Sequence, residues 1–177
     1  MGTESDYRWV QAIVGKYKTK LEEIDDSVWQ VTPPIEGWSY SEVYFHIFDA
    51  SQLSLLQLLV SAEGRGKVKP TAFMVKLILA CGMLPPGKRY KAPKTLTDRL
   101  KILSKEEILL MLERFSQQLD IAYPKINGAD LSIKAAHPVM GYLNAKHWLR
   151  FIGIHLNHHW KQLNRIEKSF KFPSLPK

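Results

Sequence analysis

The feature that most constrains this chain is a helical repeat of apolar residues in four long segments. In residues 5–29, Trp9, Ile13 and Tyr17 begin a series that recurs every three or four positions, which defines one face of an α-helix. Similar spacing predicts long helices over residues 39–60, 104–123 and 144–170, and a short helix over residues 71–81. No segment alternates between apolar and polar residues as a half-buried strand does. The sequence therefore predicts a single all-α domain, residues 1–177, built as a four-helix bundle whose long connections cap one end.

The predicted helix starts carry capping signals. Ser39-Tyr40-Ser41-Glu42 and Ser104-Lys105-Glu106-Glu107 are capping boxes, in which a serine and a glutamate satisfy each other's free backbone amides. Asn144 is the expected cap of the last helix. The inward stripe expected for the second helix consists of Val43, His46, Ile47, Ala50, Leu53, Gln57 and Val60.

Charge is unevenly distributed along the chain. The formal net charge is +8, yet residues 1–60 hold 4 Lys/Arg against 9 Asp/Glu, and residues 61–177 hold 21 against 8. The densest basic segment, residues 85–105, is a long, partly helical connection that we expect at the surface, near an anionic substrate. A nucleic-acid-binding module using this segment is an alternative. It is disfavoured, because Tyr90 is the only aromatic residue among these cations and no recognition motif is evident.

Localisation signals are also absent from the sequence. The first six residues are polar and acidic, without the features of a signal peptide, and no apolar run reaches the length of a bilayer span. We expect a cytoplasmic protein with no membrane partner. Cys81, the single cysteine, lies in an apolar run and is expected to be a buried small residue.

Histidines carry the strongest chemical signal. His155 and His159 are four residues apart, about 40° from each other on one helix face. Buried imidazoles avoid charge, and neutral imidazole is the form that binds a divalent metal ion. His46, on the inward stripe of the second helix, is the expected third ligand. Three histidines with open positions are typical of a catalytic metal site. The same face of the last helix carries Trp148, Ile152, Leu163 and Ile166.

Each of these histidine patterns has a structural alternative. Two histidines at this spacing also occur in cores that bind no metal. His158 is expected at the edge of the face or exposed to solvent. Glu42, one turn before His46, could orient that imidazole, but its capping-box role is the favoured interpretation.

Two longer motifs resemble a known family. The segment from Gly37 to His46 resembles the "G-W-S-x-x-E-x-x-x-H" signature of the DinB/YfiT-like superfamily, and the segment from His155 to Gln162 resembles its "H-x-x-H-H-x-x-Q" signature. His137-Pro138-Val139-Met140-Gly141 is similar to an "H-P-x-x-G" pattern in a branch of unknown function. The basic segment, residues 85–105, matches no motif of the family.

The resemblance implies a DinB-like four-helix bundle with one divalent metal ion, nickel, zinc or iron, held by His46, His155 and His159. It also implies a homodimer as one oligomeric state. Characterised relatives include isomerases and S-transferases that use low-molecular-weight thiols. The expected function is therefore a metal-dependent enzyme acting on a small molecule, an S-transferase or a hydrolase, with a noncatalytic metal-containing binding protein as the alternative.

Three further residues are candidates for substrate chemistry. His137 precedes a proline, which favours an extended backbone, and it is a candidate catalytic acid or base. A loop-anchoring role is the favoured alternative for this residue. Arg150 and Lys161 are candidates for binding an anionic group, although charges on a helix surface are usually solvated.

Overall fold

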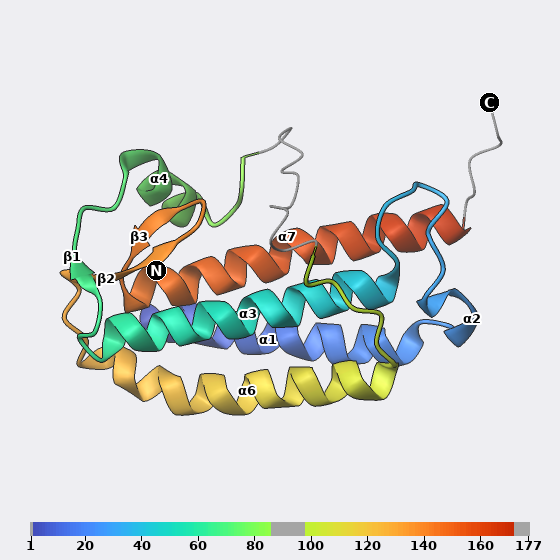
Figure 1. Ribbon diagram of the computed structural model, residues 1–177, viewed down its shortest axis with the longest axis horizontal. Coiled ribbons are helices and arrows are strands. Elements are labelled where there is room, and N and C mark those ends of the chain that lie inside the picture. The colour runs from blue at the N-terminus through green and yellow to red at the C-terminus, as the bar shows by residue number, and fades with distance from the viewer. Residues whose placement is uncertain (1, 86–97, 172–177) are drawn as a thin grey trace.

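Four long helices pack side by side in the computed structural model, which describes residues 2–85 and 98–171 (Figure 1). They are α1 (Thr3–Glu23), α3 (Tyr40–Ala62), α6 (Lys105–Asn127) and α7 (Ala145–Lys171). Both α1 and α3 contact both α6 and α7. This arrangement confirms the predicted four-helix bundle.

Three of the predicted helix starts are confirmed by their caps. The Ser39 amide donates to Glu42 at 2.8 Å while the Glu42 amide donates back to Ser39 Oγ at 3.3 Å. Ser104 and Glu107 form the same box at the start of α6. Asn144 Oδ1 accepts from the third amide beyond it at 2.9 Å, as expected for the cap of α7.

Three predicted boundaries were wrong. The single helix over residues 5–29 is two helices, because Asp25 caps a separate short helix, α2 (Asp26–Trp29). The short helix α4 is Phe73–Cys81 and begins two residues later than predicted. Helix α6 continues past Pro124 to Asn127, since a proline near the end removes only one of its hydrogen bonds.

The expectation of no strands was also wrong. Strands β1 (Lys67–Val68), β2 (Ile133–His137) and β3 (Gly141–Leu143) form an antiparallel sheet in the order β1-β2-β3. Strands of two to five residues are too short to show alternation, and their pairing depends on the fold that brings β1 to β2. Figure 1 shows the sheet and α4 together at one end of the bundle.

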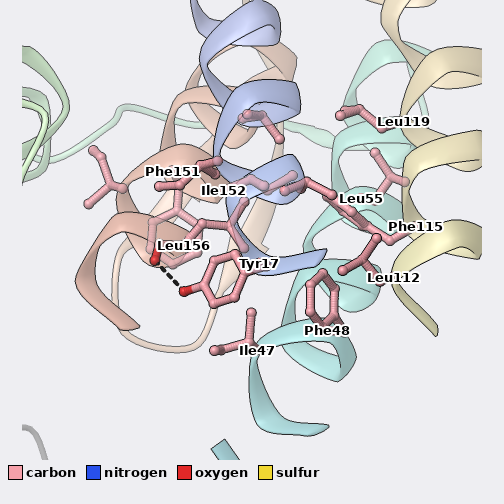
Figure 2. Close-up of a cluster of buried hydrophobic side chains, with 14 of the residues drawn as sticks. Tyr17, Ile47, Phe48, Leu55, Leu112, Phe115, Leu119, Phe151, Ile152 and Leu156 are labelled. Carbon is pink, nitrogen blue, oxygen red and sulfur yellow. Dashed lines mark hydrogen bonds between the residues drawn. The ribbon is translucent and has the colours of Figure 1, made fainter. Parts of the chain in front are cut away.

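Aromatic and branched side chains from all four long helices fill the core (Figure 2). Tyr17 is fully buried, and its hydroxyl donates to the Leu156 carbonyl at 2.7 Å. The predicted inward stripe of α3 was partly wrong, because Leu53 is 38% exposed. Since α3 contacts both α6 and α7, its buried arc instead includes Phe48 and Leu55.

Two expectations about apolar segments can be compared with the structure. Cys81, expected to be buried, is exposed at the end of α4, because that helix turns only one side toward the bundle. Within the described residues, α3 is long and apolar enough to cross a membrane, but 56% of that stretch is buried in the bundle. A core helix passes the same test of length and composition.

Candidate metal centre

Three histidines from two helices converge between α3 and α7. His46 lies in the second turn of α3, and His155 and His159 lie one turn apart in α7. The ring centroid of His46 is 5.4 Å from that of His155 and 4.8 Å from that of His159, and the two α7 rings are 4.5 Å apart. One ligand nitrogen from each residue lies within 4.8 Å of the others. The structure thus brings together the three residues that the sequence singled out.

Burial keeps these imidazoles neutral. His46 and His159 are buried, while His155 retains partial exposure. Desolvation lowers the pKa of all three rings, and it lowers the pKa of His159 to about 3. The rings also oppose one another's protonation, because two protonated imidazoles this close would repel. At neutral pH each ring therefore offers a nitrogen lone pair.

Gln162 fixes the orientation of one ring. Its Oε1 atom lies 2.7 Å from His159 Nδ1. Because an amide oxygen only accepts, Nδ1 must carry the hydrogen and Nε2 is left with the lone pair. Gln162 ends the H-x-x-H-H-x-x-Q motif, but the sequence alone indicates no role for it. Its position three residues after His159, on the same helix face, was the available signal.

An ion pair lies close to the cluster. Arg99 donates to both carboxylate oxygens of Asp49, at 2.7 and 3.1 Å. Asp49 is three residues after His46 on α3, and its charge partly offsets the effect of burial on the pKa of His46. The Trp38 ring covers another side of His46, with ring centroids 5.2 Å apart. His46 therefore contacts an indole and lies within electrostatic reach of a charged pair.

Only part of the basic segment 85–105 can be compared with the prediction. Lys88, Arg89, Lys91 and Lys94 lie outside the described residues. Arg99 pairs with Asp49, and Lys105 pairs with Asp26 and donates to the Ile24 carbonyl. These two cations contact their own chain. Attraction of an anionic substrate by the segment stays a prediction.

His137 lies near the cluster but outside it. Its Nδ1 accepts from the amides of Val139 and Met140 at 3.0 Å each, which holds the turn between β2 and β3. Its ring packs 4.5 Å from Phe151, whose ring in turn is 5.9 Å from His155. Phe151 thus lies between His137 and the cluster. The loop-anchoring contacts are observed, and a catalytic role for His137 stays a prediction.

Four other candidates take different positions. Glu42 accepts from Ser39 in the capping box, the role that the sequence favoured. His158 is half-buried beside His159, with ring centroids 5.1 Å apart. Arg150 is buried rather than solvated, because it pairs with Asp6 at 2.7 Å on the far side of α7. Lys161 is exposed, as expected for a charged side chain on a helix surface.

The donor set fits a divalent transition-metal ion. Imidazole nitrogens suit zinc, nickel and iron, whereas calcium and magnesium prefer oxygen ligands. Metal–nitrogen bonds of about 2.1 Å require ligand nitrogens within about 4 Å of one another. The ligand nitrogens lie within 4.8 Å of one another, so side-chain rotations would have to bring them slightly closer around an ion. Three ligands leave coordination positions open.

Comparison with known proteins gives a consistent picture. A family model described as the DinB superfamily matches residues 16–163. The uncharacterised protein YuaE from Bacillus subtilis (strain 168) is 25% identical over 152 residues, covering 86% of this chain and 91% of the relative.

Two solved structures share the fold. YfiT from Bacillus subtilis, described as "a probable metal-dependent hydrolase with an unusual four-helix bundle topology", has a TM-score of 0.60 and 16% identity, covering 97% of this chain and 90% of YfiT. TT2238, a four-helix bundle protein, has a TM-score of 0.59 and 20% identity, covering 93% of this chain and 99% of TT2238.

Proposed function

The chain belongs to the DinB superfamily, and on that premise we propose that it is a metal-dependent hydrolase whose His46, His155 and His159 hold one divalent cation. The observation that carries the proposal is the convergence of three neutral imidazoles whose ligand nitrogens lie within 4.8 Å. The description of YfiT as a probable metal-dependent hydrolase supports the same function.

The cluster suits catalysis better than a purely structural role. Structural metal sites usually supply four protein ligands, and this cluster supplies three. A divalent ion held there would lower the pKa of a water molecule or of a substrate thiol toward neutral pH. His155 is partly exposed, so a small molecule can approach the cluster from its side.

The surrounding side chains position the ligands. Gln162 holds His159 in the tautomer that presents Nε2. Trp38 shields His46 from water, which keeps its ring in the neutral form. His158, half-buried next to His159, is the nearest further group able to exchange a proton.

Metal analysis tests the metal site. The protein is purified without a polyhistidine tag, loaded with zinc, nickel or iron(II), and analysed for bound metal. We expect one ion per chain in the wild type and a loss of at least a hundredfold in affinity in His155→Ala. The matched control is His147→Ala, on the same helix but outside the cluster. Wild-type protein that stays free of metal would contradict the proposal.

A substrate screen then separates the remaining functions. Ester and amide substrates report hydrolysis, and thiols combined with electrophilic acceptors report S-transfer, the alternative that the family resemblance raised. We expect activity that the wild type shows and His155→Ala lacks. Metal binding without activity in either screen would support the noncatalytic binding protein instead.

A further inference from the structure

Helix α4 is apolar on two opposite sides. Val75 and Leu79 are buried on the side that faces the bundle. On the other side, Phe73, Met74 and Leu77 are 78%, 59% and 47% exposed. A helix that packs against a core on one side normally presents polar residues on the other. Among the residues that the structure describes, the outward side of α4 therefore lacks the partner that its composition suits.

The exposed side chains form one continuous surface. Phe73 and Leu77 are one turn apart, Met74 adjoins them, and the exposed Ala80 and Cys81 extend the same side by another turn. Among the described residues, α3 exposes a smaller pair, Leu53 and Leu56, three positions apart, whereas Leu110 and Ile121 lie eleven positions apart on α6 and are separated. Single exposed residues are normal, whereas a contiguous patch marks an interaction site.

Positive charge surrounds this face. The sequence contains no Asp or Glu from residue 64 to 97 or from 131 to 166, the stretches that include α4, the sheet and the first half of α7. Lys76 lies on α4, and Lys67 of β1 pairs in register with Lys134 of β2. Thr71 donates to the Tyr142 carbonyl at 2.8 Å, which ties the start of α4 to β3.

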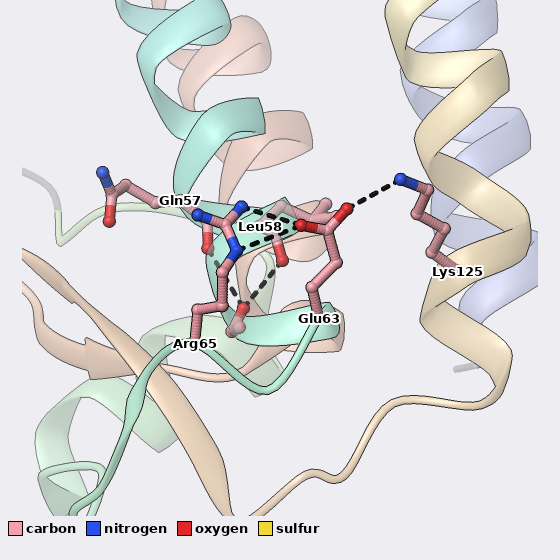
Figure 3. A network of polar contacts seen from close by, with 6 residues as sticks. Gln57, Leu58, Glu63, Arg65 and Lys125 are labelled. Atoms are coloured by element: carbon pink, nitrogen blue, oxygen red, sulfur yellow. Dashed lines mark hydrogen bonds and ion pairs between the residues drawn. The ribbon is translucent and has the colours of Figure 1, made fainter.

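Two further facts agree with a positively charged surface around α4. Besides burial, the charges of Lys134 and Lys76 lower the pKa of His147, so groups from β2, α4 and α7 are within electrostatic reach of one another. The nearest preceding acid, Glu63, is already bound by Arg65 and Lys125, each at 2.7 Å (Figure 3).

The combination of apolar and cationic surface restricts the occupant. A second copy related by twofold symmetry would bring two positively charged surfaces to the same interface. Nucleic-acid phosphates would match the charge but would leave Phe73, Met74 and Leu77 uncovered. An anionic membrane surface satisfies both features, because apolar side chains enter the headgroup–acyl boundary and lysines contact the headgroups.

We propose that the exposed face of α4, formed by Phe73, Met74 and Leu77, docks this protein on anionic membrane surfaces together with Lys76 of the same helix and with Lys67 and Lys69 of the segment that leads into it. Docking of this kind needs no spanning helix, and it differs from the sequence-based expectation of no membrane partner, which stays a prediction. It is independent of the metal centre, which lies between α3 and α7.

Vesicle co-sedimentation tests the proposal with the full chain. Vesicles of phosphatidylcholine with phosphatidylglycerol are compared with vesicles of phosphatidylcholine alone. We expect the wild type to bind the anionic vesicles and to be released by salt. The double variant Phe73→Ser/Met74→Ser should bind at least tenfold more weakly. Replacing Lys67, Lys69 and Lys76 by Gln should weaken binding about a hundredfold, at roughly fivefold per lysine.

Matched controls separate docking from loss of folding. Leu110→Ser/Ile121→Ser removes exposed apolar residues of α6 and should leave vesicle binding unchanged. Circular dichroism and light scattering check the fold and the mass of each variant. Absence of binding to anionic vesicles would overturn the proposal. A wild-type dimer that Phe73→Ser/Met74→Ser converts to monomers would overturn it too, because it would assign the face to a second copy.

Discussion

Helix α7 carries two buried polar sites that differ in how their polar atoms are satisfied. Near its start, Arg150 Nη1 donates to Asp6 at 2.7 Å, its Nε donates to the Leu79 carbonyl at 3.0 Å, and its guanidinium lies 5.0 Å from the centre of the Trp9 ring. Two turns later, His155 and His159 face His46 with ligand nitrogens that converge on one another.

The difference separates a structural site from a site suited to a ligand. The arginine site pairs opposite charges and joins α1, α4 and α7. Because its charges already neutralise each other, an added ion would not stabilise it. The histidine site avoids charge by holding its rings neutral, which leaves one ligand nitrogen of each ring within 4.8 Å of the others. Burial alone therefore does not indicate function; the convergence of three neutral imidazoles does.

Removing Asp6 should have the largest effect on stability. In Asp6→Ala the buried Arg150 loses its carboxylate, so we expect the free energy of unfolding to fall by about 3–5 kcal/mol. The matched control is Glu4→Ala, which breaks the exposed Glu4–Arg8 pair and should cost less than about 1 kcal/mol. Urea denaturation measures the free energy of unfolding of both variants. Equal losses would show that the buried Asp6–Arg150 pair does not stabilise the fold more than the exposed pair.

Adding a metal ion that binds the histidine site should stabilise the folded protein. At a free concentration about a hundredfold above Kd, a bound ion raises the free energy of unfolding by about 2.7 kcal/mol. We expect zinc or nickel to raise the thermal midpoint of the wild type and of Asp6→Ala, but not that of His155→Ala. A rise in His155→Ala as large as that in the wild type would place metal binding elsewhere.

Replacing Gln162 should weaken metal binding without abolishing it. In Gln162→Leu, His159 loses the acceptor that fixes its tautomer, and we expect metal affinity to fall about 10- to 100-fold. Gln162→Glu keeps an acceptor and should restore affinity. Gln117→Leu, on the exposed side of α6, is the control. Calorimetric titration gives each Kd; unchanged affinity in Gln162→Leu would mean that the contact does not position the ring.

The smallest expected effect concerns pH. Burial lowers the pKa of His137 from 6.5 to about 4 in the folded protein. Between these values the unfolded chain binds more protons, so acidification through this window reduces stability and stability is regained as pH rises. By about pH 5, protonation of His137 in the unfolded chain should lower the free energy of unfolding by about 1 kcal/mol, a value reduced because His137 is partly exposed. Urea denaturation at pH 5 and 7 should show a smaller acid-induced loss in His137→Asn; an equal loss would contradict the prediction.

Local signals predicted much of this protein. The predicted capping boxes at Ser39 and Ser104 are confirmed, and each forms between two residues only three positions apart. The spacing of His155 and His159 predicted a pair on one helix face for the same reason. Such contacts depend on helix geometry alone, which the sequence specifies directly.

Contacts between distant segments were not predicted. Arg150 was read as a surface cation, since Asp6 is 144 positions away. The pairing of Lys67 with Lys134 and the exposure of Cys81 also depend on how α4 and the sheet lie against the bundle. None of these leaves a periodic signal in the sequence.

The sequence by itself therefore determined the four-helix architecture and nominated His46, His155 and His159, because helical periodicity and motif spacing are local properties. Only the tertiary structure decided that these three rings meet, that Phe151 lies between His137 and the cluster, and that α4 turns an apolar face to solvent. The physical reason is that burial, and with it pKa and charge pairing, depends on which elements pack together.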